Sequence, residues 1–324
     1  MKNSEYPKFS ELSVTNPVCR PFYVRKMDDA VGNNGKPYVT LTLYDGFSVM
    51  KCNCFDKTVR MMNEEGVNEK GIYVCKFTKN DRGYTNIESG IKANIDPDIK
   101  VSDFGQRIEQ DPEELFASLI KGLKAVRDTR FGEDTLSDLA VKLLTDNHDE
   151  FVRSSAAISM HHEQEGGLVL HSHSVTNAAY HLSKVYKKLD VELLVCGAAL
   201  HDIGKIKEYV TDELGFATFS PLGQGLGHSV YGIEMVEQEA KKGNYNEERV
   251  MLLKHIIASH HGELEYGAIA KPAIPEAVLI HCLDDADAKL NMFEKIYKDL
   301  APGQNTEKSM FGLDTKAYKP SFLE

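Results

Sequence analysis

Histidine and aspartate side chains recur from about the midpoint of this 324-residue chain onward, in an order that suits metal binding. In chain order the series consists of His171, His201, Asp202, His228, His260, His261 and Asp284. Each interrupts an apolar segment, at or near the end of an expected helix or in its first turn. The intervals of roughly 25 to 30 residues suit one helix and its return. Because bundle helices can each project one imidazole or carboxylate toward a common centre, the series predicts a metal site between helices.

The adjacent pair His201 and Asp202 restricts where that site can lie. Consecutive helical residues diverge by roughly 100°, so both can serve one site only if it lies close against the end of their helix. A carboxylate can bridge two ions about 3.5 to 4 Å apart. Without coordination, Asp202 would be costly to bury in so apolar a segment, and cations would remove that cost.

The residues after Asp111 have the periodicity of helices, and we expect an all-α bundle over residues 101–302. In DPEELFASLIKGL, Asp111 is the expected N-cap, with proline at the first helical position and glutamates in the first turn. Nearly every segment from there to about Leu300 has a helical pattern. The tail, residues 303–324, is polar but carries spaced apolar residues, and we expect it to dock on the body.

Residues 1–100 have the short alternating pattern of strands. Val39, Leu41 and Leu43 alternate with polar or aromatic residues, as in a half-buried strand. Four or five such strands in under a hundred residues suit a small closed barrel such as the OB-fold, with a sandwich as the alternative. The expected fold class is therefore multidomain α+β, a small β-barrel followed by a helical bundle.

Charge and composition restrict the functional classes. The net charge is −11, and it divides into +2 for residues 1–100 and −13 for the remainder. So acidic a C-terminal part argues against indiscriminate nucleic-acid binding unless cations or a local basic groove intervene. The sequence begins with no basic-then-apolar leader and has no apolar run long enough for a membrane span, so we expect a cytoplasmic protein without a membrane partner. The six cysteines lack zinc-knuckle spacing and are expected to be free thiols.

The histidine and aspartate series resembles that of the HD superfamily of metal-dependent phosphohydrolases, and its extra histidines resemble the dinuclear branch. The resemblance implies one ion held by His171, His201, Asp202 and Asp284. It implies a second ion held by His228 and His260, with Asp202 bridging. His261 would be a ligand or a substrate contact, and Asp285 is the alternative to Asp284 if the helix is turned by one residue.

Four further segments, HHEQEGGLVLHS, LHDIGKIKEY, ASHHGE and DDADAKLNMF, are similar to the YhaM-type 3′–5′ exoribonucleases, which combine an OB-fold with an HD domain. The chain departs from that family at Ser155, where proline is usual, and in HSHS, where His-Thr is usual. The resemblance implies a phosphodiesterase that trims single-stranded RNA or DNA from the 3′ end. The alternatives are a phosphohydrolase of free nucleotides or cyclic dinucleotides, and a non-catalytic nucleic-acid-binding module with a structural metal.

The phosphodiesterase hypothesis assigns roles to individual polar residues. Asp202 and Lys205 are the expected catalytic residues, and Lys205, His162 and His261 are expected to contact substrate. Imidazoles and carboxylates without thiolate suit two divalent ions, with Mn²⁺ expected and Fe²⁺, Co²⁺ or Zn²⁺ as alternatives. A homo-oligomer is compatible with the sequence.

Aromatic and basic residues are interleaved in the N-terminal strands, and such residues hold single strands on OB-folds. Filling of the domain core is the alternative role for the aromatic residues. They are Phe22, Tyr23, Tyr38, Tyr44, Phe47, Phe55, Tyr73 and Phe77.

Overall fold

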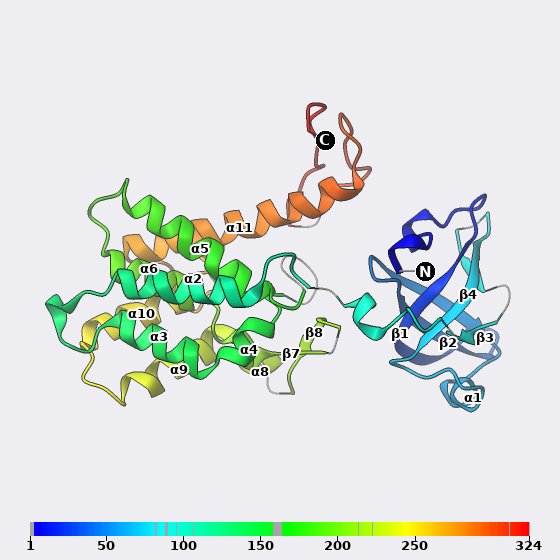
Figure 1. Cartoon of the computed structure of the whole chain (residues 1–324), viewed down its shortest axis with the longest axis horizontal. Coiled ribbons are helices and arrows are strands. Elements are labelled where there is room, and N and C mark those ends of the chain that lie inside the picture. The colour runs from blue at the N-terminus through cyan, green and yellow to red at the C-terminus, as the bar shows by residue number, and fades with distance from the viewer. Residues whose placement is uncertain are drawn as a thin grey trace. The chain divides into compact units, whose positions relative to one another are not determined.

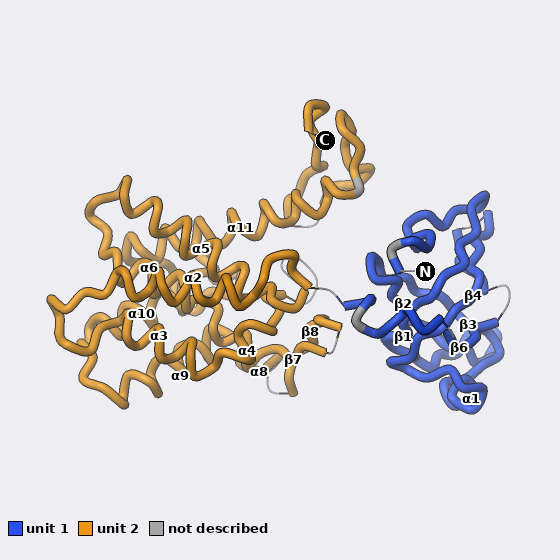
Figure 2. The backbone as a smooth tube through the Cα atoms, viewed as in Figure 1, with its two compact units in different colours: residues 1–106 blue, residues 107–324 orange. Residues whose placement is uncertain are grey.

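The computed structural model describes residues 3–81, 83–87, 90–94, 96–105, 107–157, 164–212, 214–221, 223–310 and 312–323. The chain divides into two compact units, Met1–Gln106 and Arg107–Glu324 (Figure 2). The second unit includes the tail after residue 302. None of the helices in the described residues is long and apolar enough to cross a membrane.

The first unit is built on one antiparallel sheet (Figure 1), whose strand order is β3-β2-β1-β4-β5, with β6 paired to β4. Its strands are β1 (Val18–Val31), β2 (Pro37–Tyr44), β3 (Val49–Phe55), β4 (Ile72–Lys79), β5 (Thr85–Ile87) and β6 (Lys92–Ala93). Its helices are η1 (Asn3–Glu5), η2 (Phe9–Glu11), α1 (Val59–Glu64) and η3 (Val101–Phe104).

The sheet does not close into the barrel expected from the sequence. Among the described residues, no ladder joins the two outer strands β3 and β5. Strand β1 is long enough to pair with β2 along one part and with β4 along another, with a register shift between Val24 and Lys26. β5 and β6 are too short to complete a circuit, so the closed barrel is wrong and an OB-like identity stays a prediction.

The alternation expected in β2 is confirmed, because Val39, Leu41 and Leu43 are fully buried. The same core contains Phe22 and Phe77, whose rings meet nearly edge to face at 5.3 Å. The core role thus holds for most of the interleaved aromatics, namely Phe22, Tyr23, Tyr44, Tyr73 and Phe77. Tyr38, Phe47 and Phe55 remain at least partly exposed.

A buried ion pair joins Arg20 on β1 to Asp45 after β2, with Nη1 and Oδ2 3.3 Å apart and both side chains fully buried. Asp45 also accepts hydrogen bonds from the backbone N–H groups of Phe9, Phe47 and Ser48 at 2.6 to 2.8 Å. Both carboxylate oxygens are therefore satisfied by the protein itself.

The second unit is a helical bundle (Figure 1). Its helices are α2 (Pro112–Ala125), η4 (Thr129–Phe131), α3 (Leu136–Asp146), α4 (His148–Arg153), α5 (Gly167–Ser183), α6 (Val191–Leu200), α7 (Lys205–Glu208), α8 (Gly223–Leu226), α9 (His228–Ala240), α10 (Glu247–Ser259), η5 (Leu264–Tyr266) and α11 (Pro275–Asp299). The expected start of α2 is confirmed, because the Asp111 side chain accepts a hydrogen bond from the backbone N–H of Glu113 and proline follows the cap. The unit is not purely helical, since β7 (Tyr209–Thr211) and β8 (Ala217–Phe219) form a hairpin.

Helix α6 forms the centre of the bundle. Every residue from Glu192 to Leu200 is buried, and a helix that is apolar on all sides belongs in a core. α5, α10 and α11 all pack against it. The chain therefore delivers the residues that follow α6, His201 and Asp202, into the interior between helices.

Candidate metal centre

Two of the predicted ligands are placed by the same local arrangement at the end of a helix. His201 directly follows α6 and His260 directly follows α10, both with helical backbone angles. Nδ1 of His201 donates to the carbonyl oxygen of Ala198, and Nδ1 of His260 donates to that of Ile257, each at 2.7 Å. Each ring is thus oriented by its own helix, and its Nε2 is left for the site.

His171 and Asp284 come from the bodies of helices rather than from their ends, contrary to the expectation. His171 lies in the second turn of α5 and is fully buried, while Asp284 lies within α11. Nε2 of His171 lies 3.1 Å from Oδ1 of Asp284 and 3.1 Å from Nε2 of His201. Nδ1 of His171 lies 2.7 Å from Oδ2 of Asp287.

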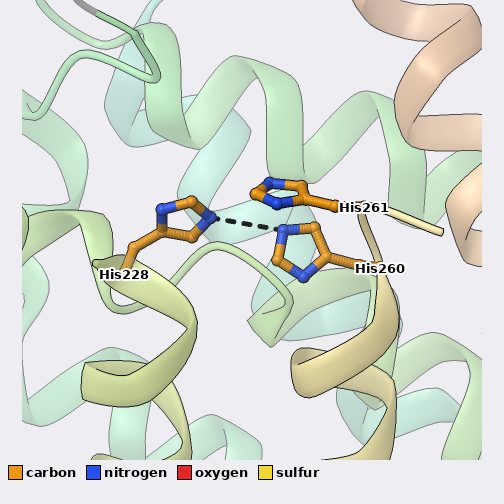
Figure 3. A group of neighbouring side chains, drawn as sticks. All are labelled: His228, His260 and His261. Carbon is orange, nitrogen blue, oxygen red and sulfur yellow. Dashed lines mark hydrogen bonds between the residues drawn. The ribbon is translucent and has the colours of Figure 1, made fainter. Parts of the chain in front are cut away.

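His228 begins α9 and faces His260 across 3.3 Å between their Nε2 atoms (Figure 3). Its Nδ1 lies 2.8 Å from Oε2 of Glu208 on α7. The turn of LHDIGK packs tightly here, because a Cβ on Gly204 would collide with the carbonyl oxygen of His228. Glycine at this position therefore lets the Asp202 turn approach the start of α9.

Asp202 is 1 % exposed and lies between two pairs of imidazoles, His171 with His201 and His228 with His260. Its Oδ2 is 3.4 Å from Nε2 of both His171 and His201. Its Oδ1 is 3.4 Å from Nε2 of His228 and 3.6 Å from Nε2 of His260. Each oxygen thus faces a different pair of imidazoles, which is the orientation that a bridging carboxylate requires.

The hydrogen-bond partners of the four imidazoles around Asp202 indicate that their Nε2 atoms can bind cations. In each ring, Nδ1 faces a group that accepts: a backbone carbonyl for His201 and His260, and a carboxylate for His171 and His228. A neutral imidazole with hydrogen on Nδ1 has a lone pair on Nε2. The Nε2 atoms of His171 and His201 are 3.1 Å apart, and those of His228 and His260 are 3.3 Å apart. Lone pairs that face each other at these distances, next to a carboxylate, repel unless a cation or a proton lies between them. The donor set therefore fits divalent ions.

The carboxylate of Asp202 gives independent support. Lys205 Nζ lies 2.6 Å from Oδ2, yet neither Asp202 oxygen receives a hydrogen bond of good geometry from the described residues. Burial alone would raise the pKa of Asp202, but the positive charge of Lys205 beside it holds that pKa well below its usual range. A buried, ionised carboxylate with unsatisfied lone pairs is a site that a cation would complete.

A proton can fill part of this role when no ion is bound. Burial opposes protonation of His171, but its hydrogen bonds to Asp284 and Asp287 raise the pKa of His171 to about 10. Burial and the neighbouring rings lower the pKa of His260 well below its usual value. The two groups of ligands thus differ in charge before any ion enters.

The rotation of α11 about its axis distinguishes the two candidate ligands Asp284 and Asp285. Asp284 faces His171, whereas the half-exposed side chain of Asp285 extends to Lys289, at 2.7 Å. His281 lies one turn before Asp284 on α11, and its Nδ1 is 2.9 Å from the carbonyl oxygen of His260. His281 therefore helps to position the start of the loop that follows His260.

The predicted substrate contacts are placed only in part. The His261 ring lies 4.1 Å from that of His260 and 5.0 Å from that of His228 (Figure 3), and its Nδ1 has no hydrogen-bond partner among the described residues. Lys205 is buried beside Asp202. His261 can therefore serve as ligand or substrate contact, and His162 lies outside the described residues.

Two carboxylates complete the cluster in roles the sequence did not reveal. Glu208 and Asp287 orient His228 and His171, and such partners fix the ring and raise the basicity of a ligating imidazole. The pKa of Glu208 is lowered: burial would raise it, but the His228 bond outweighs this. Glu208 lies within LHDIGKIKEY beside two lysines, where an acidic residue is ordinary, so the sequence offers no signal of its role.

Imidazoles and carboxylates brought together by separate helices give this unit the side chains of a candidate metal site. Two sets of side chains have ligand atoms within 4.8 Å of one another: His171, His201 and Asp284, and His228, His260 and His261. Residues 168–292 match the family model described as HD domain. HD domains bind divalent metals and are typically metal-dependent hydrolases, so the match supports a phosphohydrolase of the HD superfamily.

Proposed function

We propose that this protein is a metal-dependent phosphodiesterase that removes nucleotides from the 3′ end of single-stranded RNA, and of single-stranded DNA as a second substrate. The observation that carries the proposal is Asp202, whose two oxygens each face a separate pair of imidazoles. Two ions held there would activate a water and stabilise charge on the phosphoryl oxygens and the leaving group.

The chain's own residues perform the remaining tasks. Asp202, held at the end of α6, faces both pairs of imidazoles and would bind both ions through its two oxygens. Lys205 supplies a buried positive charge 2.6 Å from Asp202, from which it can bind a phosphoryl oxygen. Glu208 and Asp287 keep two imidazoles in the ligating tautomer. Nδ1 of His261 is buried and has no hydrogen-bond partner among the described residues, so it can bind a group that enters the centre.

The nucleic-acid substrate is supported by the outer face of β2 and β3. Tyr38 and Phe55 lie opposite each other with ring centroids 5.8 Å apart, and Phe55 is 68 % exposed. Next along the same face, Thr40 donates to Asn53 at 3.0 Å, followed by the exposed Lys51. Exposed aromatic rings beside a cation are what a single strand requires for base stacking and phosphate contact.

A 5′-labelled single-stranded RNA incubated with Mn²⁺, Co²⁺ or Mg²⁺ tests the proposal. Wild-type protein and the exposed-carboxylate control Asp285→Asn should both yield a ladder of products shortened from the 3′ end, and Asp202→Ala should not. A free nucleotide and a cyclic dinucleotide are assayed in parallel. Turnover of these alone would replace the proposal with a small-molecule phosphohydrolase, and RNA binding without turnover under any metal would indicate a binding module.

A further inference from the structure

The face of α11 that carries Asp284 continues beyond the metal cluster into a groove. On a helix with 100° per residue, Asn291, Lys295 and Lys298 project within about 40° of the direction of Asp284. All three line a groove of about 690 Å³, together with Lys319 of the C-terminal tail. Leu170, which precedes His171 in α5, lines the same groove, and Asn291 at its near end lies about 10 Å along α11 from Asp284.

The charge of this groove contrasts with that of its surroundings. It is lined by three lysines and two glutamates, Glu109 and Glu294, in a part of the chain whose net charge is −13. The buried Lys319 is held in place, because its Nζ donates to the carbonyl oxygen of Tyr297 at 3.0 Å. Lys298 is 69 % exposed and contacts the exposed Glu109 at 3.4 Å, a weak pair that an incoming phosphate can replace.

We propose that this groove is the track along which the phosphate backbone of a single-stranded nucleic acid reaches the metal centre. The inference rests on the proposed function and adds the part of the substrate that lies upstream of the reacting end. Lys298 lies 14 positions beyond Asp284, which corresponds to about 21 Å of helix. At the roughly 3.4 Å spacing of stacked nucleotides, the track spans about six nucleotides.

The test uses the full chain and uridine oligomers of 20 and 4 nucleotides. Lys295→Gln combined with Lys298→Gln should raise KM for the 20-mer about tenfold, and the increase should be much smaller for the 4-mer. In chelator, which prevents hydrolysis, the salt dependence of 20-mer binding should fall by about 0.7 in slope for each lost phosphate contact. An unchanged KM and slope, or equal changes for both lengths, would overturn the inference.

Two matched controls separate the track from general effects. Lys289→Gln removes a lysine from another face of α11, where it pairs with Asp285, and should leave 20-mer binding unchanged. Glu109→Gln breaks the same surface pair as Lys298→Gln but keeps the lysine, so it should bind the 20-mer at least as tightly as wild type. Weakening by either control to the extent seen in the lysine variants would show a structural effect and reject the track.

The failure of this inference can be told from failure of the proposed function. If wild-type protein shortens RNA and the lysine variants match it, the groove is not the track and the exonuclease stands. If wild-type protein binds the 20-mer in a lysine-dependent manner but never shortens it, the track stands and the exonuclease is rejected. If it neither binds nor shortens the 20-mer, both are rejected.

Discussion

Two buried aspartates, one in each unit, show how a carboxylate can be held for opposite purposes. Asp45 in the sheet unit has Arg20 beside it and accepts hydrogen bonds from three backbone N–H groups. Asp202 in the helical unit is just as buried, yet neither oxygen receives a hydrogen bond of good geometry within the described residues. The first is completed by the protein, whereas the second lies among imidazole nitrogens that, together with its own oxygens, could bind a metal ion.

The largest expected effect is on catalysis. Asp202→Asn removes the charge that both halves of the centre share, and we expect turnover of RNA to fall by about 10³-fold or more. Asp45→Asn should retain wild-type turnover at a temperature where it remains folded. Steady-state assays at saturating Mn²⁺ measure both, and an Asp202→Asn enzyme within tenfold of wild type would remove this carboxylate from the chemistry.

Stability should respond in the reverse order. Asp45→Asn leaves the Arg20 guanidinium buried without its counter-charge, which costs about 3 to 5 kcal/mol. Calorimetric or circular-dichroism melting of the full chain should show an earlier transition for the sheet unit. A melting profile equal to that of wild type would mean that Asp45 is not the partner that Arg20 depends on.

Metal should stabilise the helical unit and leave the sheet unit unchanged. At a free Mn²⁺ concentration 100 times Kd, binding adds about 2.7 kcal/mol to the stability of the helical unit, which chelation removes. This gain should be lost in Asp202→Asn and kept in Asp45→Asn. Equal metal-induced shifts in both variants would place the ion elsewhere in the chain.

The pH dependence of metal binding should be set largely by His171. Its pKa of about 10 in the ion-free protein lies above the ordinary value, so its proton adds stability below about pH 6.5 that is lost as pH rises toward 10. Mn²⁺ must displace that proton, so its affinity should increase up to about tenfold per pH unit between 6.5 and 8.5. Calorimetry in buffers of different ionisation enthalpy measures the released proton; a flat affinity would contradict the assignment.

The smallest effect should come from Asp285→Asn, one residue from a predicted ligand. Its side chain is half exposed and pairs with Lys289 on the helix surface, so both activity and stability should change by less than about twofold and 0.5 kcal/mol. Asp284→Asn serves as the matched variant and should abolish binding of one ion. Interchanged results would mean that α11 is rotated by one residue from its position here.

The sequence predicted correctly those features that depend on residues close together in the chain. The cap at Asp111 and the alternation of Val39, Leu41 and Leu43 depend on neighbours in the chain, and both are confirmed. The order of histidines and aspartates likewise indicated a shared centre, since no single helix could supply all of them.

The remaining features depend on contacts between distant segments. Choosing between Asp284 and Asp285 required the rotation of α11 against α5, which hydrophobic spacing does not fix to within one residue. Glu208 and Asp287 could not be assigned to particular rings, because a hydrogen bond to an imidazole nitrogen depends on the packed positions of two helices. Sheet closure depends on whether the edge strands pair, which strand length alone does not determine.

The four rings differ in how readily mutation could retune them. His201 and His260 are oriented by main-chain carbonyls of their own helices, so no side-chain substitution can change the group that polarises them. His171 and His228 are instead polarised by the replaceable carboxylates Asp287 and Glu208. Each pair of imidazoles therefore contains one ring oriented by the main chain and one oriented by a carboxylate side chain. The metal preference of either pair could be changed separately, by evolution or by engineering, through a single acidic residue.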